Sequence, residues 1–316
     1  MRKKTYKALI FLAIVVVIFS IALAIGIKYR QHIALTGRTG LFTSQQTTTA
    51  ITEKTNPVIP ENSTFEIHFF DVGEADSALV ECDGHYMLID GGNPGSSSFL
   101  YSYLQHHKID YLDYVVCSHA HTDHAGGLAG ALNYASVGTA YAPVMEYDSR
   151  AFSSLVKYLQ AQGKEVTIPS SGDTVMLGSA KISFLGPIDM SIAEQNHNNA
   201  SIILRIEYGS TSFLFTGDAE IEEEKSLIGA GLRLQSTLLK VGHHGSNTSS
   251  SEEFLTKVKP EYAIISVGKD NEYGHPHNEA IERILKFCSL IYRTDTHGEI
   301  ICRSDGEQLS FDFSHS

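Results

Sequence analysis

Hydrophobic and polar positions divide the chain into three segments of different character. Residues 8–27 form an uninterrupted stretch of 20 residues without a charge. Residues 31–63 show little apolar periodicity and contain scattered Ser, Gln and Gly beside a run of three threonines. From residue 64 onward, short apolar or alternating runs are separated by turns that contain Gly and Asp, and this pattern predicts a folded domain over 64–316.

The first half of this domain has the pattern of several strands followed by helices. An Asp-Gly pair at 83–84 lies between two strand-like runs and predicts a hairpin. A helix is expected from Ser96, which would cap it, to residue 107. The predicted strands of this half cover 65–71, 77–82, 85–90, 112–117 and 139–142, and a second helix covers 149–162.

A second block of strands begins near residue 174. Its predicted strands cover 175–177, 181–185, 201–208, 211–215, 237–241 and 262–267, and its helices cover 219–228, 251–258 and 279–287. Two packed sheets with helices outside them, an α/β/β/α sandwich, fit this order better than a single doubly wound sheet. The first block has no glycine-rich phosphate loop, which argues against a nucleotide-binding fold.

The apolar stretch 8–27 has the length and the flanks of a membrane segment. At about 1.5 Å per residue it would span about 30 Å, the thickness of a bilayer core. Four cations precede it (Arg2, Lys3, Lys4 and Lys7), which favours an inside N-terminus and a domain outside the cell membrane. The alternative is a cleaved signal peptide and a secreted domain, because residues 22–24 read Ala-Leu-Ala. We therefore expect an anchor or signal peptide over 1–30 and a flexible linker over 31–63.

The charge of the predicted domain limits its modes of binding. Residues 1–63 hold eight of the 24 Lys and Arg but only two of the 36 Asp and Glu. Residues 64–316 therefore carry 16 cations and 34 anions, a formal balance of −18. Such a domain has no general basic surface for wrapping duplex nucleic acid, so a polyanionic substrate must be held locally, chiefly by metal.

The cysteines carry little information about function. Cys82, Cys117, Cys288 and Cys302 are widely separated and form no CxxC pair. Cys82 and Cys117 end apolar runs, which predicts buried thiols. A disulfide stays open for an exported domain.

Four potential metal ligands occur within six residues, directly after the predicted strand 112–117. Residues 118–124 read SHAHTDH, and the potential metal ligands in this segment are His119, His121, Asp123 and His124. Such side chains cannot share one strand face, but on a tight loop they can converge on one or two borderline metal ions. Other carboxylates and imidazoles also follow predicted strands, at Asp218, in GHHGS (242–246) and in YGHPH (273–277).

These motifs resemble a known family. Residues 119–124 match the HxHxDH motif of metallo-β-lactamase-fold hydrolases, and TGD (216–218) is similar to their bridging aspartate. DVGEADS (71–77), LIDGG (88–92), GHHGS and YGHPH narrow the resemblance to the extracellular hydrolase domain of ComEC-type DNA-uptake proteins. It covers essentially all of 64–316 and implies the metallo-β-lactamase-type α/β/β/α sandwich. Since no multi-pass channel region is present, we expect a stand-alone, membrane-tethered or secreted relative.

The resemblance also implies roles for individual residues. His119 and His121 would ligate a first metal ion, Asp123 and His124 a second, and Asp218 would bridge both. His275 matches the last histidine of the second site, with His277 as the alternative. The third imidazole of the first site has no clear counterpart, because that region reads NHNNAS (196–201), where His197 is the one candidate.

The residue types themselves suggest the chemistry. Two divalent ions, Zn²⁺ or Mn²⁺, about 3.5–4 Å apart can hold a hydroxide and neutralise a phosphoryl oxygen. Asp123 could orient the hydroxide while it also binds metal. His243 or His244 could contact a phosphoryl oxygen or protonate the leaving group. Asp71, Asp76 and Asp90 are expected to be structural, tying loops beneath the site.

The sequence thus predicts an exported metal-dependent hydrolase, a phosphodiesterase or nuclease that acts on extracellular DNA. A cell-surface phosphodiesterase acting on teichoic-acid phosphorylcholine is the first alternative enzyme, and a β-lactam or thioester hydrolase the second. A tethered module that guides DNA without cleaving it is the non-enzymatic alternative.

Overall fold

Two β-sheets form the centre of the structure, a computed structural model that describes residues 59–315. The first sheet has the strand order β15-β14-β1-β2-β3-β4-β5-β6. Strands β1, β2, β14 and β15 pair antiparallel, whereas β3, β4, β5 and β6 run parallel. Its strands cover Phe65–Phe69 (β1), Ala78–Cys82 (β2), His85–Ile89 (β3), Tyr111–Val116 (β4), Ser136–Tyr141 (β5), Val166–Thr167 (β6), Ile300–Ser304 (β14) and Leu309–Phe313 (β15).

The second sheet has the order β13-β12-β11-β10-β9-β8-β7. Strands β10 to β13 are parallel neighbours, and β7, β8 and β9 continue the sheet antiparallel. Its strands cover Thr174–Leu177 (β7), Ala180–Gly186 (β8), Ile203–Tyr208 (β9), Thr211–Phe215 (β10), Leu238–Lys240 (β11), Tyr262–Ile265 (β12) and Leu290–Arg293 (β13).

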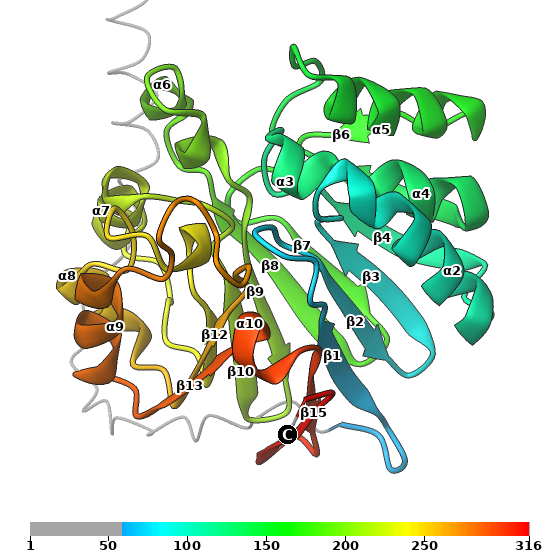
Figure 1. Cartoon of the computed structure of the whole chain (residues 1–316). Coiled ribbons are helices and arrows are strands. Elements are labelled where there is room, and N and C mark those ends of the chain that lie inside the picture. The colour runs from blue at the N-terminus through cyan, green and yellow to red at the C-terminus, as the bar shows by residue number, and fades with distance from the viewer. Residues whose placement is uncertain (1–58, 316) are drawn as a thin grey trace, which may run out of the picture. The chain divides into compact units, whose positions relative to one another are not determined.

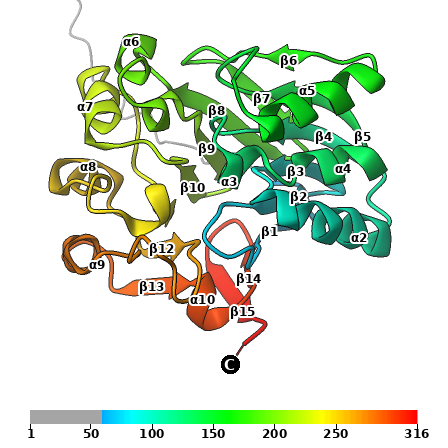
Figure 2. The same cartoon turned by 45° about the horizontal axis from the view of Figure 1, so that its top comes forward.

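Helices cover the outer face of each sheet (Figures 1 and 2), which confirms the predicted two-sheet sandwich. On the first sheet these are α2 (Ser97–His107), α4 (Leu128–Tyr134) and α5 (Arg150–Ala161), and on the second α7 (Ile221–Gly229), α8 (Glu252–Val258) and α9 (Asn278–Leu285). The shorter elements are α3 (Thr122–Ala125), α6 (Met190–Ala193) and α10 (Thr294–His297), with 3-10 turns η1 (Pro94–Ser96), η2 (His197–Ala200) and η3 (His243–Gly245).

Three apolar cores hold these layers together. Between the sheets, Phe65 stacks on Tyr208 and Phe69 on Phe215, with ring centroids 4.9 and 5.8 Å apart. A second core joins α2, α4 and α5 to the outer face of the first sheet, and a third joins α7, α8 and α9 to the second sheet. Because each sheet has an apolar layer on both faces, its strands are buried and their ends are fixed in position.

Local sequence explains most element boundaries. Asp83 and Gly84 have φ values of 55° and 78°, as a two-residue hairpin turn requires, so the predicted hairpin β2–β3 is confirmed. Ser149 and Ser251 cap α5 and α8 by accepting bonds from backbone N–H groups three residues on. Ser96 occupies the N-cap position of α2 as predicted, but it also ends the 3-10 turn η1 and its side chain makes no capping bond.

The carboxyl ends of β4, β10, β11 and β12 all lead into loops that carry the predicted site residues. Within residues 59–315 no helix is long and apolar enough to cross a membrane. The predicted membrane segment 8–27 and most of the predicted linker lie outside the described residues.

Candidate metal centre

The loop after β4 is fixed from below by Asp90. One carboxylate oxygen of Asp90 accepts a hydrogen bond from the Ser118 N–H at 2.7 Å, and the other lies 2.9 Å from Nδ1 of His124. Asp90, His119 and His124 are almost completely buried. Asp90 therefore has the supporting role expected for it, since its bond to Nδ1 leaves Nε2 of His124 facing Asp218 and Asp123.

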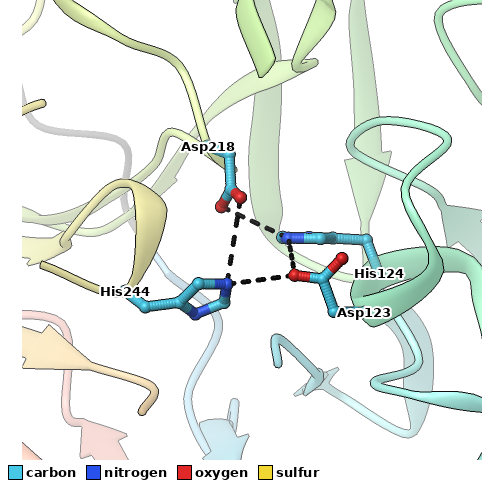
Figure 3. Close-up of side chains that lie close together, drawn as sticks. All are labelled: Asp123, His124, Asp218 and His244. Atoms are coloured by element: carbon cyan, nitrogen blue, oxygen red, sulfur yellow. Dashed lines mark hydrogen bonds and ion pairs between the residues drawn. The ribbon is translucent and has the colours of Figure 1, made fainter. Parts of the chain in front are cut away.

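Four side chains from three loops converge at the carboxyl ends of the strands (Figure 3). Asp123 and His124 come from α3, Asp218 follows β10, and His244 follows β11. Nε2 of His124 lies 3.2 Å from Oδ1 of Asp218 and 3.6 Å from Oδ2 of Asp123. Nε2 of His244 lies 3.3 Å from the same Asp123 oxygen and 3.8 Å from Asp218. One ligand atom of each residue thus lies within 4.8 Å of all the others.

Two atoms of this group lie 3.2 Å apart as an ion pair, yet neither makes a hydrogen bond of good geometry among the described residues. They are Nε2 of His124 and Oδ1 of Asp218, and both are buried. A buried polar atom without a good hydrogen bond is costly, so a third component that contacts both atoms would stabilise this pair. Two imidazoles and two carboxylates are donors that borderline divalent metals accept. These residues therefore fit a metal ion.

The ionised carboxylates of the group favour positive charge beside them. Burial alone would lower the pKa of His124, but the carboxylates of Asp218 and Asp90 outweigh burial and raise that pKa well above its ordinary value. The pKa of His244 is raised in the same way. Burial would raise the pKa of Asp123, yet His124 and His244 lower it to about 2. The carboxylates thus stay ionised and attract positive charge, which either protons or a metal ion can supply.

His119 and His121 lie next to the four-residue group. Nε2 of His119 is 3.9 Å from Oδ2 of Asp218 and 2.9 Å from Nδ1 of His121. Burial and the neighbouring His124 lower the pKa of His119 well below its ordinary value, and burial also lowers that of His121. Neutral imidazoles are the form that binds metal, so this pair and Asp218 offer ligands for a further ion.

The structure brings His244, rather than His275, into the four-residue group. Nδ1 of His275 lies 2.7 Å from Oε1 of Glu74, and its ring is 6.2 Å from that of His244. His277 accepts a bond from the Asn247 N–H at its Nδ1, so it too is engaged elsewhere. His197 is exposed and lies beside Tyr147, 5.2 Å between ring centroids.

An unusual backbone explains the placement of His243 and His244. Their φ values are 49° and 52°, a left-handed conformation that non-glycine residues rarely adopt. The turn directs His244 inward, where its Nδ1 lies 3.0 Å from the carbonyl oxygen of Ser266. His243 is partly exposed, and its Nδ1 lies 3.3 Å from Oε1 of Glu220. A strained backbone of this kind is found where function fixes side-chain positions.

Two buried contacts beneath the site were not predicted from the sequence. Lys240 of β11 donates to Oδ2 of Asp76 at 2.7 Å, and Oδ1 of Asp76 lies 3.5 Å from Nδ1 of His244. Glu74 holds His275, as described above, and also accepts from the Gly268 N–H. Asp76 is thereby a supporting residue, as expected, whereas Asp71 is exposed and accepts only from the Gly73 N–H.

Comparison with known proteins agrees with this fold. Residues 70–269 match the family described as Metallo-beta-lactamase superfamily, and the chain belongs to that superfamily. It is 28% identical over 253 residues to ComE operon protein 3 of Bacillus subtilis, an alignment that covers 74% of this chain and 32% of that protein. It is 32% identical over 244 residues to Competence protein ComA of Neisseria gonorrhoeae, covering 77% of this chain and 32% of that protein.

A third relative, Recombination protein 2 of Haemophilus influenzae, is 31% identical over 245 residues, covering 75% of this chain and 28% of that protein. The chain thus spans about a third of the length of these curated relatives. The resemblance to competence proteins of the ComEC type is confirmed.

Proposed function

We propose that this protein is an exported phosphodiesterase that uses two divalent ions, Zn²⁺ or Mn²⁺, to cleave DNA. The observation that carries the proposal is the convergence of the buried His124 and Asp218 atoms with Asp123 and His244. Relatives named as competence proteins support DNA as the substrate. The apolar stretch 8–27, with its preceding cations, supports a membrane anchor and a domain outside the cell.

In this proposal the ligands divide between two ions. His119, His121 and Asp218 hold the first, and Asp123, His124, Asp218 and His244 hold the second. When bound, the ions neutralise a phosphoryl oxygen and lower the pKa of a water molecule to about 7. This division assigns His244 to metal binding. His275, which is bonded to Glu74, is then a supporting residue beside the site.

The other residues act on the substrate and the water. Asp123 has a side chain about one-third exposed, so its carboxylate can orient the attacking water. His243 turns Nδ1 toward Glu220, which leaves its Nε2, 3.9 Å from Oδ2 of Asp218, facing the site. That nitrogen is placed to bind a phosphoryl oxygen or to protonate the leaving group.

The test uses the full-length chain, stripped of metal and then given Mn²⁺ or Zn²⁺ separately. Substrates are single-stranded DNA, duplex DNA, bis-p-nitrophenyl phosphate and a chromogenic β-lactam. We expect phosphodiester cleavage, and we expect Asp123→Asn and Asp218→Asn each to reduce its rate by at least about 100-fold. Replacing a residue that merely supports a metal ligand already costs up to about 100-fold in activity. The exposed carboxylate variant Glu253→Gln is the control and should cleave normally.

Each other outcome contradicts the proposal in a distinct way. Cleavage of the β-lactam alone would indicate a different hydrolase. DNA binding without cleavage under either metal would favour the guiding module. Cleavage that persists in both aspartate variants would place the reaction outside this site.

A further inference from the structure

The imidazole rings of the site form a series in which successive rings are neighbours. His121 and His119 have ring centroids 4.6 Å apart, and His119 and His124 are 4.2 Å apart. The series continues from His124 to His244 at 5.6 Å and from His244 to His275 at 6.2 Å. A tyrosine stands next to each end of this series.

Tyr273 stands beside the His275 end and is unusually exposed. Its ring lies parallel to that of His275, with centroids 5.7 Å apart and planes inclined by 17°. The residue is 63% exposed. A single exposed aromatic residue needs no explanation by itself, but this one lies on a residue that borders the metal ligands.

The loop that carries Tyr273 is held firmly. The Asn271 side chain accepts from the His275 N–H at 2.9 Å and donates to the His275 carbonyl oxygen. Glu74 holds the His275 ring at 2.7 Å and the Gly268 N–H at 2.8 Å. The His275 ring on which Tyr273 lies is therefore fixed in position before any ligand binds.

Tyr147 stands beside the other end of the series. Its ring centroid is 6.1 Å from that of His121, and the exposed His197 packs edge-on against it at 5.2 Å. Aromatic surfaces thus border the site on the side of the first predicted ion and on the side of the second.

Charge supports the same interpretation. The domain carries 34 anions against 16 cations, and Lys240 beneath the site is already paired with Asp76. The domain as a whole therefore offers little general electrostatic attraction for a nucleic-acid strand. Base stacking on aromatic rings is the other main source of affinity for single strands, and it requires no net positive charge.

We propose that Tyr273, supported by His275, is a substrate-positioning residue that stacks on a nucleobase next to the phosphodiester to be cleaved. This inference rests on the proposed function. Tyr147 borders the other end of the series but is half-buried against the core of the first sheet, so Tyr273 is the exposed ring of the two. Bases inside a duplex are already stacked and cannot reach such rings, so the contact selects an unpaired nucleotide.

The kinetic test compares two esters with the same leaving group, p-nitrophenyl thymidine 5′-phosphate and methyl p-nitrophenyl phosphate. We expect Tyr273→Leu to lower the ratio of their kcat/KM values by about 10-fold, mainly through a higher KM for the thymidine ester. Tyr273→Phe keeps the ring and should keep the ratio. Tyr111→Leu, at an exposed tyrosine at the start of β4, is the matched control and should also keep it. An unchanged ratio in Tyr273→Leu would overturn the proposal.

A binding test separates this inference from the proposed function, should the protein cleave neither ester. The chain contains no tryptophan, so Tyr273→Trp introduces a single fluorescent reporter. We expect saturable quenching by a single-stranded phosphorothioate oligothymidylate, and no quenching in Tyr111→Trp. Absence of quenching at position 273, or equal quenching by the same oligonucleotide in a duplex, would overturn base stacking there.

Discussion

Lys240 extends from β11 to Asp76, and both side chains are almost completely removed from solvent. Burial alone would raise the pKa of Asp76, but the ammonium group of Lys240 and the nearby His244 hold that pKa far below its ordinary value. The ion pair therefore keeps the Asp76 carboxylate ionised next to Nδ1 of His244. Removing one partner would leave the other as an uncompensated buried charge.

We expect Lys240→Met to reduce the free energy of unfolding by about 3–5 kcal/mol, the usual cost of breaking a buried pair. Urea denaturation measures this loss. The double variant Lys240→Met/Asp76→Asn should recover part of it, because no charge is then left unpaired. Lys181→Met, at an exposed lysine of β8, is the control. A loss within about 0.5 kcal/mol of that control, the range of surface substitutions, would show that the pair does not stabilise the fold.

Site residues could be proposed from the sequence where the signal was local. Residues 119–124 contain four potential metal ligands in one short loop. Two of them, Asp123 and His124, lie in the four-residue group. Lys240 gave no such signal, because its partner Asp76 is 164 positions away and a lysine at the end of a strand has many possible roles. The choice between His244 and His275 depends on two left-handed backbone positions that histidine rarely occupies.

At the scale of elements, close backbone approach sets the relative position of α2 and α4 on the first sheet. Gly130 lies in α4, where a Cβ atom would come within 2.1 Å of the Ser97 carbonyl oxygen at the start of α2. A methyl group at this position would push the two helices apart.

We therefore expect Gly130→Ala to destabilise the fold by about 1–3 kcal/mol, the cost of overpacking, although alanine is the better helix former. The matched control is Gly229→Ala in α7, where a Cβ atom would meet nothing within 4 Å. That variant should be neutral or more stable by up to about 1 kcal/mol. Thermal unfolding of the two variants side by side measures the difference. Equal effects would show that α2 and α4 can separate without cost.

Element boundaries were predictable from apolar periodicity and turn residues. Strand β10 has the predicted bounds, and α5 lies one residue inside its prediction at each end. Ser96 shows the limit of that approach, because a serine before an apolar run can equally well end a 3-10 turn. The order of strands in each sheet was not predicted, since it depends on long-range pairing such as β1 with β14.

At the scale of the whole molecule, the candidate metal centre joins the two sheets. Asp123 and His124 follow β4 of the first sheet, and Asp218 and His244 follow β10 and β11 of the second. Without a metal ion, protons on His124 and His244 balance the charge of the two carboxylates, because the pKa values of both histidines are raised. An ion bound by ligands from both sheets would stabilise the folded domain as a unit, because the unfolded chain does not assemble the site.

We expect Mn²⁺ or Zn²⁺ at about 100 times its dissociation constant to stabilise the folded chain by about 2.7 kcal/mol, or about 5–10 °C in Tm. Chelation should reverse the shift. His244→Ala should lose most of it, because this imidazole lies in the four-residue group, whereas His275→Ala should retain it. The opposite order would return His275 to the role that the family resemblance implies. The exposed variant Glu253→Gln should respond like the parent chain. Because the Tm measurement needs no substrate, it tests the metal ligands independently of any activity. It also distinguishes a metal ion that joins the two sheets from one that only binds an exposed carboxylate.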